Sequence, residues 1–302
     1  MEGFYEQLCQ ILNQKQVMCG ERMSRHTTFR TGGPAAYFVE PATAGELAAV
    51  LELCRRQQMP YCILGNGSNL LVSDQGYDGV VVEMGKAWSQ VTVTENCLTA
   101  GAGTKLVSVA REALKASLTG LEFAAGIPGT VGGAVVMNAG AYGSEIKQVL
   151  RQVTVLTAAG TVQQLDASEL ELGYRTSCIL QRGYVVLAAA FELQPGDSAA
   201  ILARMEELSE QRRSKQPLEY PSAGSTFKRP EGYFAGKLIE DAGLRGFRVG
   251  GAQVSEKHCG FVVNYDHATA ADIMDLCQEV QRKVREQSGI SLELEVKTLG
   301  MC

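Results

Sequence analysis

The stretch GLEFAAGIPGTVGGAVVMNAGAYG at residues 120–143 decides the fold. Seven of its residues are glycine, which lets the backbone adopt positive φ and approach another surface closely. Residues 127–130 predict a turn into a short helix, whose free N–H groups at its start could bind phosphate. A buried, tightly packed turn is the alternative interpretation. The density of glycine, followed by Asn138, favours a backbone wrapped around a large flat ligand.

A second glycine loop follows an apolar strand predicted at 61–64. Its sequence GNGSN, residues 65–69, can converge several N–H groups on one anion. It is not a dinucleotide fingerprint, because Leu70 stands at the position of the third glycine. Alone the loop is equally compatible with an ordinary hairpin turn, and its pairing with 126–133 favours a phosphate site. The expected cofactor contacts are Gly65, Asn66, Gly67, Ser68, Asn69, Gly126, Ile127, Gly129, Thr130, Gly132, Gly133, Asn138 and Gly140.

Composition limits the possible classes of protein. The net charge of −5 argues against nucleic acid as the main partner, and no apolar run is long enough to span a membrane. The N-terminus has no basic region typical of a signal peptide. Nine cysteines without a C-x-x-C pair indicate reduced thiols, so we expect a cytoplasmic protein. Three histidines without metal-ligand spacing predict no metal site.

The fold class predicted is α+β, in parts spanning 1–85, 86–195 and 196–302. The last boundary is the turn-forming segment 194–197. The strand at 184–193 is nearly all apolar and should be central in its sheet. Further strands are expected at 36–39, 79–84, 98–101, 149–156, 162–165, 252–255, 261–264 and 291–298. Helices are expected over 1–20, after the caps Thr43, Thr104 and Thr269, and at 198–215 and 234–241.

Several motifs occur together in one order. They are TFRTGG at 28–33, GNGSNLL, GIPGTVGGA, MNAGAYG, Tyr174-Arg175, GSTFKRP at 224–230 and LELEVK. In this order they resemble the UDP-N-acetylenolpyruvoylglucosamine reductase family, the flavoenzymes of peptidoglycan precursor synthesis. The resemblance covers roughly residues 20–300, and the absence of a longer lid segment is similar to the compact branch. It implies a two-part FAD-binding fold of the vanillyl-alcohol-oxidase type (1–85 and 86–195), followed by a smaller substrate domain.

The resemblance also implies the chemistry. NADPH gives a hydride to non-covalent FAD, which passes it to the enolpyruvyl ether of UDP-N-acetylglucosamine to form UDP-N-acetylmuramate. Arg175 matches the arginine that stabilises the enolate, Ser225 the serine that protonates it, and Glu295 a glutamate beside the substrate carboxylate. The expected substrate contacts are Tyr174, Arg212, Lys228 and Lys237. Without the resemblance, an ordinary solvated residue of a loop, turn or helix end is the favoured interpretation of Arg175, Ser225 and the cations.

The alternation in LELEV predicts that Glu293 and Glu295 face the same side of a strand, where both could be solvated or where the neighbouring carboxyl group would raise the pKa of Glu295. Two other classes stay open. A flavin-dependent oxidase would often tether its flavin through histidine, and His26 is the only histidine before residue 258. A non-catalytic FAD or nucleotide sensor would bind flavin without NADPH turnover. For partners we expect a sugar nucleotide and NADPH, no nucleic acid, no membrane and a monomer.

Overall fold

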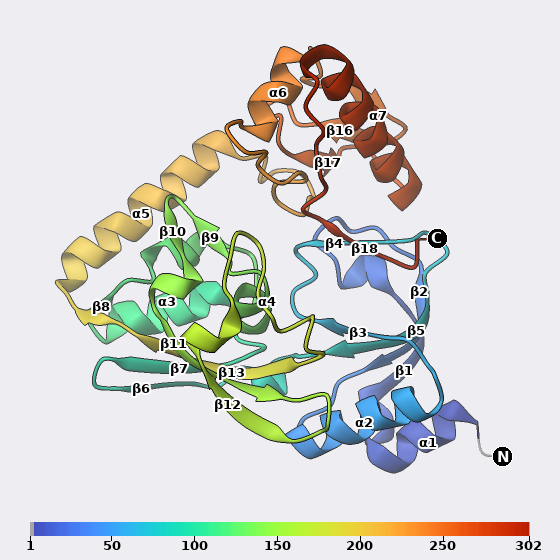
Figure 1. Cartoon of the computed structure of the whole chain (residues 1–302), viewed down its shortest axis with the longest axis vertical. Coiled ribbons are helices and arrows are strands. Elements are labelled where there is room, and N and C mark those ends of the chain that lie inside the picture. Colours follow the sequence, from blue (N-terminus) through green and yellow to red (C-terminus); the bar gives the residue numbers. More distant parts are fainter. Residues whose placement is uncertain (1–2, 302) are drawn as a thin grey trace. The chain divides into compact units, whose positions relative to one another are not determined.

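The computed structural model describes residues 3–301, which divide into two compact units (Figure 1). The first unit comprises Met1–Cys19, Tyr37–Asn66 and Gly79–Gln211. The second comprises Gly20–Ala36, Gly67–Asp78 and Arg212–Cys302. Each unit is therefore assembled from segments that are distant in sequence. The predicted division at residues 85 and 195 stays a prediction.

An antiparallel five-stranded sheet dominates the first unit. Its order is β12 (Val162–Asp166), β11 (Leu150–Leu156), β13 (Val185–Glu192), β7 (Cys97–Gly101) and β6 (Val91–Thr94). The apolar strand β13 is central, as its composition predicted. A strand between two neighbours exposes little backbone to water, so an apolar sequence is favoured there.

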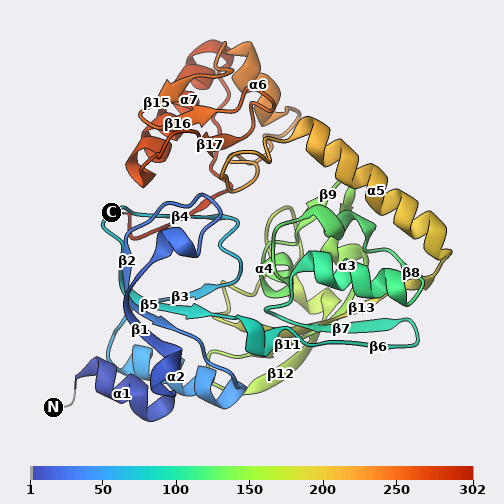
Figure 2. The ribbon, with the colours of Figure 1, turned by 180° about the vertical axis from the view of Figure 1, so that it is seen from behind.

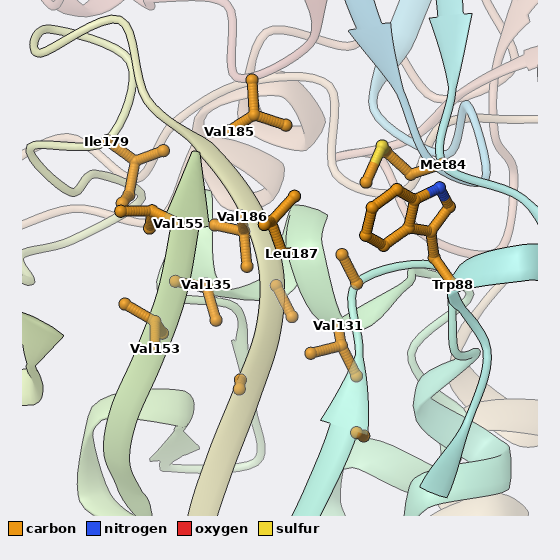
Figure 3. Close-up of a cluster of buried hydrophobic side chains, with 14 of the residues drawn as sticks. Met84, Trp88, Val131, Val135, Val153, Val155, Ile179, Val185, Val186 and Leu187 are labelled. Carbon is orange, nitrogen blue, oxygen red and sulfur yellow. The ribbon is translucent and has the colours of Figure 1, made fainter. Parts of the chain in front are cut away.

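Two helices cover one face of this sheet. Figures 1 and 2 show α3 (Leu106–Lys115) and α4 (Val131–Val136) on the same side of it. Figure 3 shows Val131 and Val135 of α4 among side chains from the sheet, including Val153 and Leu187. The Trp88 indole is buried in the same core and donates a hydrogen bond of 2.7 Å to the Pro41 carbonyl. This core holds the glycine-rich stretch against the sheet.

A second sheet has the order β1 (Val17–Arg22), β2 (Pro34–Val39), β5 (Tyr77–Glu83) and β3 (Tyr61–Leu64). Helices α1 (Phe4–Ile11) and α2 (Ala44–Arg56) pack against each other in the first unit. The predicted helix over 1–20 is wrong beyond Ile11. Asn13 caps a short 3₁₀ turn there, and the chain then enters β1 because sheet pairing outweighs the helical pattern.

The second unit contains a three-stranded antiparallel sheet, β15 (Arg248–Val249), β16 (Ala252–Val254) and β17 (Val262–Asn264). Helix α7 (Ala270–Ser288) packs on it and also contacts α6 (Ala235–Asp241). The buried face of α7 includes Ile273, Leu276 and Val280. Phe29 joins this core from the N-terminal part of the chain.

Short elements complete the two units. Strand β4 (Leu70–Val72) pairs in parallel with β18 (Lys297–Leu299), and the two-residue strands pair as hairpins or bridges. These are β8 (Leu118–Thr119) with β14 (Gln194–Pro195), and β9 (Gly140–Ala141) with β10 (Ser144–Glu145). Helix α5 spans Ser198–Lys215. Within residues 3–301 no helix combines the length and apolarity needed to cross a bilayer.

Two of the three predicted helix caps are confirmed. Thr43 accepts a hydrogen bond from the Glu46 N–H at 3.1 Å, and Thr269 accepts one from the Asp272 N–H at 3.0 Å. Thr104 is not a cap, because α3 begins one residue later behind Lys105. Its side chain is buried and its hydroxyl donates to the Gln90 carbonyl instead.

Two carboxyl groups meet at the ends of neighbouring strands in the second sheet. Glu83 ends β5, and Glu40 directly follows β2. Burial, together with a hydrogen bond to Glu40 and repulsion from its charge, raises the pKa of Glu83 to about 7 from the ordinary value of 4.5. The folded protein therefore binds more protons than the unfolded chain between these two pH values, and stability falls as pH rises through this window.

We expect Glu83→Gln to remove the loss of folding stability that occurs as the pH rises from about 4.5 to about 7. The variant should gain thermal stability relative to the unsubstituted protein at pH 8, and gain little or nothing at pH 5, where Glu83 is already protonated. Thermal denaturation at both pH values measures the difference. Glu192→Gln, at the exposed end of β13, is the control and should show no such pH dependence. An equal change in Tm at pH 5 and pH 8 for Glu83→Gln would contradict the assignment.

Candidate functional site

The two glycine loops meet in the first unit. The Asn66 side-chain amide donates to the Pro128 carbonyl at 2.7 Å. Gly65 lies so close to Thr130 that a Cβ at Gly65 would collide with the Thr130 hydroxyl. The prediction that these loops form one site is therefore supported by direct contact between Gly65-Asn66 and 128–130.

The start of α4 differs from the prediction. Its first N–H groups are not free, because Val131 donates to the Thr104 carbonyl at 2.9 Å and Gly132 donates to the Ala102 carbonyl at 2.8 Å. A Cβ at Gly132 would lie 3.1 Å from that of Ala102. This glycine therefore allows close packing of two backbone segments, and these two N–H groups cannot also bind a phosphate.

Other parts of the glycine-rich segments remain accessible. A Cβ at Gly133 would meet only the Thr130 hydroxyl, at 3.7 Å, so the backbone there has open space beside it. The predicted cofactor residues that are at least partly accessible are Gly65, Asn66, Ser68, Asn69, Gly126, Ile127, Gly129, Gly132, Gly133 and Gly140. Small residues with accessible backbone on two touching loops suit a large ligand that contacts both.

The remainder of the GNGSN loop lies in the second unit. Gly67 is buried with φ +58, and a Cβ there would collide with the His26 carbonyl. Asn69 bonds to the segment that carries Glu295: its side chain donates to the Glu295 carbonyl at 3.2 Å, and its own carbonyl accepts from the Lys297 N–H at 3.0 Å. The second glycine loop is thus attached to one of the predicted catalytic segments.

Ser225 and Glu295 come from adjacent backbone segments of the second unit. Phe227 and Leu294 form an antiparallel bridge, and the Glu295 N–H donates to the Thr226 carbonyl at 2.8 Å. Ser225 itself is exposed. The structure therefore brings together two predicted catalytic residues that are far apart in sequence.

Thr226 holds this pairing and was not predicted. It is 1% exposed, its N–H donates to the Gly260 carbonyl at 2.9 Å, and its hydroxyl accepts from the Val262 N–H at 2.9 Å. Together with the bond to Glu295, Thr226 makes hydrogen bonds to the backbone of three residues that are distant in sequence from Ser225. No sequence pattern indicated this, because the partners come from distant segments.

Glu293 and Glu295 do not behave as an alternating strand pair. Residues 292–296 form only the isolated bridge at Leu294, and the regular strand begins at Lys297. Glu293 is exposed and pairs with Lys228 at 2.9 Å, which lowers the pKa of Glu293. Glu295 is 9% exposed. Glu293 is thus paired with a cation at the surface, and the raised pKa that we predicted for Glu295 stays a prediction.

The predicted phosphate-binding cations already have protein contacts. Besides the Lys228 pair, the Lys237 ammonium contacts Asp241 at 2.6 Å, which raises the pKa of Lys237. Arg212 lies in the last turn of α5. Exposed ion pairs of this kind contribute little and exchange readily. The predicted contacts of these three residues with the substrate diphosphate stay predictions.

Tyr174 and Arg175 form the tip of a tight turn in the first unit. Gly173 and Thr176 pair at its base, and Arg175 has φ +55. The Arg175 guanidinium lies 5.3 Å from the centre of the exposed Tyr174 ring and donates to the Gly140 carbonyl at 3.3 Å. A half-buried guanidinium at a turn can bind a carboxylate through two parallel bonds.

Asn138 has a different place from the one predicted. It is fully buried, and its amide group bonds to Glu145, Gly173 and Lys147 of the protein. These contacts give the side chain a structural role in place of the cofactor contact that we expected, because an amide with both donors engaged has none left for a ligand.

Comparison with known proteins identifies the family. Residues 216–299 match the C-terminal domain of UDP-N-acetylenolpyruvoylglucosamine reductase, and residues 35–166 match an FAD binding domain. The chain is 54% identical to UDP-N-acetylenolpyruvoylglucosamine reductase of Agathobacter rectalis over 99% of both chains. It is 52% identical to that of Lachnoclostridium phytofermentans over 98% of this chain and 96% of the relative. The chain belongs to the UDP-N-acetylenolpyruvoylglucosamine reductase family.

Solved structures agree with this family. The reductase of Thermus caldophilus has a TM-score of 0.80 at 37% identity, covering 92% of this chain and 97% of that one. Phl p 4.0202, a glucose dehydrogenase, has a TM-score of 0.53 at 16% identity over 65% of this chain and 45% of its own, which shows the fold alone. The reductase chain thus has an FAD-binding fold of the vanillyl-alcohol-oxidase type and the family's C-terminal domain. Within residues 3–301, no group of three or more His, Cys, Asp or Glu side chains is arranged to hold a metal ion.

The contact between Gly65 and Thr130 can be tested through FAD affinity. We expect Gly65→Ala to weaken FAD binding by about tenfold or more, since forcing a methyl group into packed structure costs ~1–3 kcal/mol. Removing the opposing hydroxyl in Gly65→Ala/Thr130→Ala should restore part of the affinity. Fluorescence titration of the apoprotein with FAD measures both. Gly45→Ala, whose new Cβ has no neighbour closer than 3.9 Å, is the control. Unchanged affinity in Gly65→Ala would refute the packing argument.

The contribution of Thr226 can be tested through stability. Thr226→Val keeps the shape but leaves the buried Val262 N–H without an acceptor, so we expect a loss of about 1–3 kcal/mol in the free energy of unfolding. Thr226→Ser keeps the acceptor and should lose less. Urea denaturation of the FAD-bound protein gives both values. If the serine variant is the less stable of the two, packing of the methyl group matters more than the hydrogen bond.

Proposed function

We propose that three residues carry out the substrate half-reaction. The chain is a reductase of UDP-N-acetylenolpyruvoylglucosamine that uses NADPH and bound FAD. Arg175 stabilises the enolate, Ser225 protonates it, and Glu295 lies beside the substrate carboxylate. The observation that carries this proposal is the backbone pairing of the Ser225 segment with the Glu295 segment. That pairing keeps a hydroxyl and a carboxyl group in one region of the second unit.

FAD is held by the two glycine loops. The touching segments Gly65-Asn66 and 126–133 supply accessible backbone, and the close approach of Gly65 to Thr130 supports a ligand bound along both. The chemistry that bound FAD supplies is hydride relay from NADPH to the methylene carbon of the enol ether. We propose that FAD binds without a covalent link.

Hydride addition at the methylene carbon leaves negative charge next to the substrate carboxylate, as an enolate. A guanidinium is charged at every physiological pH and binds two oxygens through parallel hydrogen bonds. Arg175 supplies this group from a turn whose base is paired and whose tip is held by Gly140. Stabilising charge that develops only in the transition state increases the rate of the chemical step.

The enolate then takes a proton, which we assign to the Ser225 hydroxyl. Ser225 is exposed, and Thr226, which follows it, is fixed by backbone hydrogen bonds to Gly260 and Glu295 and by a hydrogen bond from Val262 to its hydroxyl. A serine hydroxyl is a weak acid, so its position must be well defined for it to donate efficiently. The rigid attachment of Thr226 supports this role.

Glu295 acts as an electrostatic partner or as an acid for the same step. Its burial and its backbone hydrogen bond to Thr226 support this position more than that of a solvated surface charge, because carboxylates are mostly exposed. Tyr174, Arg212, Lys228 and Lys237 remain our candidates for the sugar nucleotide. Their exposure or position at loop and helix ends supports contact with a charged, extended ligand.

We also propose that the protein is a cytoplasmic monomer. All eight cysteines among the described residues are free thiols, which is typical of a reducing compartment. A nucleotide substrate and NADPH are both intracellular metabolites, which fits the same location.

Ser225→Ala separates the two half-reactions. It removes a hydroxyl from an exposed position, so the fold and FAD binding should persist. Flavin reduction by NADPH requires no enolate and should stay within a few-fold of the unsubstituted rate. Reoxidation by the enolpyruvyl substrate should slow by about 10²–10⁴-fold, as is usual for a positioned proton donor. Ser225→Cys should recover part of the rate, because a thiol can still donate.

Anaerobic stopped-flow absorbance measures each half-reaction alone. Equal slowing of both halves by Ser225→Ala would make Ser225 a binding or structural residue. No change in either half would remove the loop at 222–229 from the active site. Absence of reoxidation by the enolpyruvyl sugar nucleotide in the unsubstituted protein would refute the proposed function itself.

A further inference from the structure

We propose that Asn138 is a positioning residue for Arg175: through Glu145 and the Gly173 carbonyl, it sets the turn that presents the guanidinium. This inference rests on the proposed role of Arg175 in stabilising the enolate. It gives Asn138 a function in the substrate half-reaction, where the sequence had suggested a contact with FAD.

The contacts of Asn138 form a closed set. Its amide nitrogen donates to the Glu145 carboxylate at 2.8 Å and to the Gly173 carbonyl at 3.0 Å. Its amide oxygen accepts from the Lys147 N–H at 3.0 Å. The Lys147 ammonium in turn contacts the second oxygen of Glu145 at 2.7 Å. Both donors of the amide are therefore used, and Glu145 is held from two sides.

The same short segment holds both ends of the Arg175 turn. The Asn138 side chain binds the carbonyl of Gly173 at the base of the turn, and the Gly140 carbonyl accepts from the guanidinium itself. Segment 138–140 lies about 35 residues before the turn in the sequence, so these contacts tie the turn to another part of the fold. Loss of the Asn138 contact removes the side-chain hydrogen bond to the Gly173 carbonyl at the base of the turn.

The turn needs such an anchor because of its backbone and its side chain. Arg175 has φ +55, a conformation that residues with a Cβ adopt at some cost unless their surroundings hold them there. An arginine side chain also has many rotamers, so a loosened turn spreads the guanidinium over several positions. A displacement of about 1 Å from the productive position can cost roughly 10²-fold in rate.

Asn138 is also suited to its own place. It has φ +40, in the left-handed region that asparagine tolerates better than most residues, and it is fully buried. Glycine and aspartate tolerate the same backbone conformation. Asn138→Gly deletes the amide without backbone strain. Asn138→Asp keeps the size and the acceptor but removes both donors.

The experiment measures both half-reactions of the FAD-bound, full-length variants by anaerobic stopped flow. We expect both substitutions to retain FAD and to be reduced by NADPH within a few-fold of the unsubstituted rate. The limiting rate of reoxidation by the enolpyruvyl substrate should fall roughly ten- to hundredfold. The substrate concentration that gives half of this rate should change less, because the enolate charge develops only during the reaction. The aspartate variant provides the same test should the glycine variant not be recovered.

A double-mutant cycle with Arg175→Ala tests whether Asn138 acts through Arg175. Once the guanidinium is removed, Asn138→Gly should cause little further slowing, since coupled residues are not additive. Gln253→Ala is the matched control for a lost buried amide: Gln253 is 3% exposed and donates to the Gly246 carbonyl in the second unit. It should lower thermal stability without slowing reoxidation.

The outcomes distinguish the positioning role of Asn138 from the proposed role of Arg175. Full additivity of Asn138→Gly and Arg175→Ala would overturn the positioning role while leaving the role of Arg175 intact. Loss of FAD, or slow reduction by NADPH in both Asn138 variants, would overturn it in favour of a cofactor contact. Unchanged reoxidation in Arg175→Ala would overturn both the inference and the proposed role of Arg175.

Discussion

The backbone pairing of residues 226–228 with 293–295 is the interaction on which the second unit's part of the site depends. Thr226 joins it to Gly260 and Val262, and Asn69 joins it to the second glycine loop through Glu295. A backbone hydrogen bond contributes only about 1 kcal/mol, but an unpaired buried donor costs more. The arrangement therefore persists because each buried group in it would lose its partner if the segments separated.

In the first unit, glycine serves packing as much as ligand binding. Gly132 lets α4 lie against the segment 102–104, and Gly65 lets one loop reach Thr130. A side chain at either place would push the two packed backbone segments apart. Glycines that make room for a flat ligand and glycines that allow close backbone packing look alike in the sequence, because both uses depend on the missing Cβ. In this fold the two purposes occur side by side.

A hydrogen-bonded network around the buried Asn138 specifies the Arg175 turn. Asn138, Glu145 and Lys147 satisfy one another and leave a single arrangement for Gly173. Such a network is costly when incomplete, which favours one conformation of the turn over others. The charged residue at the tip of the turn is thus placed by a neutral amide and an ion pair.

Local sequence determined the elements whose signals are local. The caps at Thr43 and Thr269, the short helix α4 and the apolar strand β13 each depend on residues within one turn or one strand, so their prediction from sequence succeeded. The order of motifs determined the family. Tertiary structure alone decided what depends on segments distant in sequence: β1 in place of a longer first helix, the split between Glu293 at the surface and Glu295 in the interior, and the burial of Asn138. The physical reason is that the local sequence allows several conformations at these places. Hydrogen bonds to residues far along the chain stabilise one of them, and no local pattern shows where those partners lie.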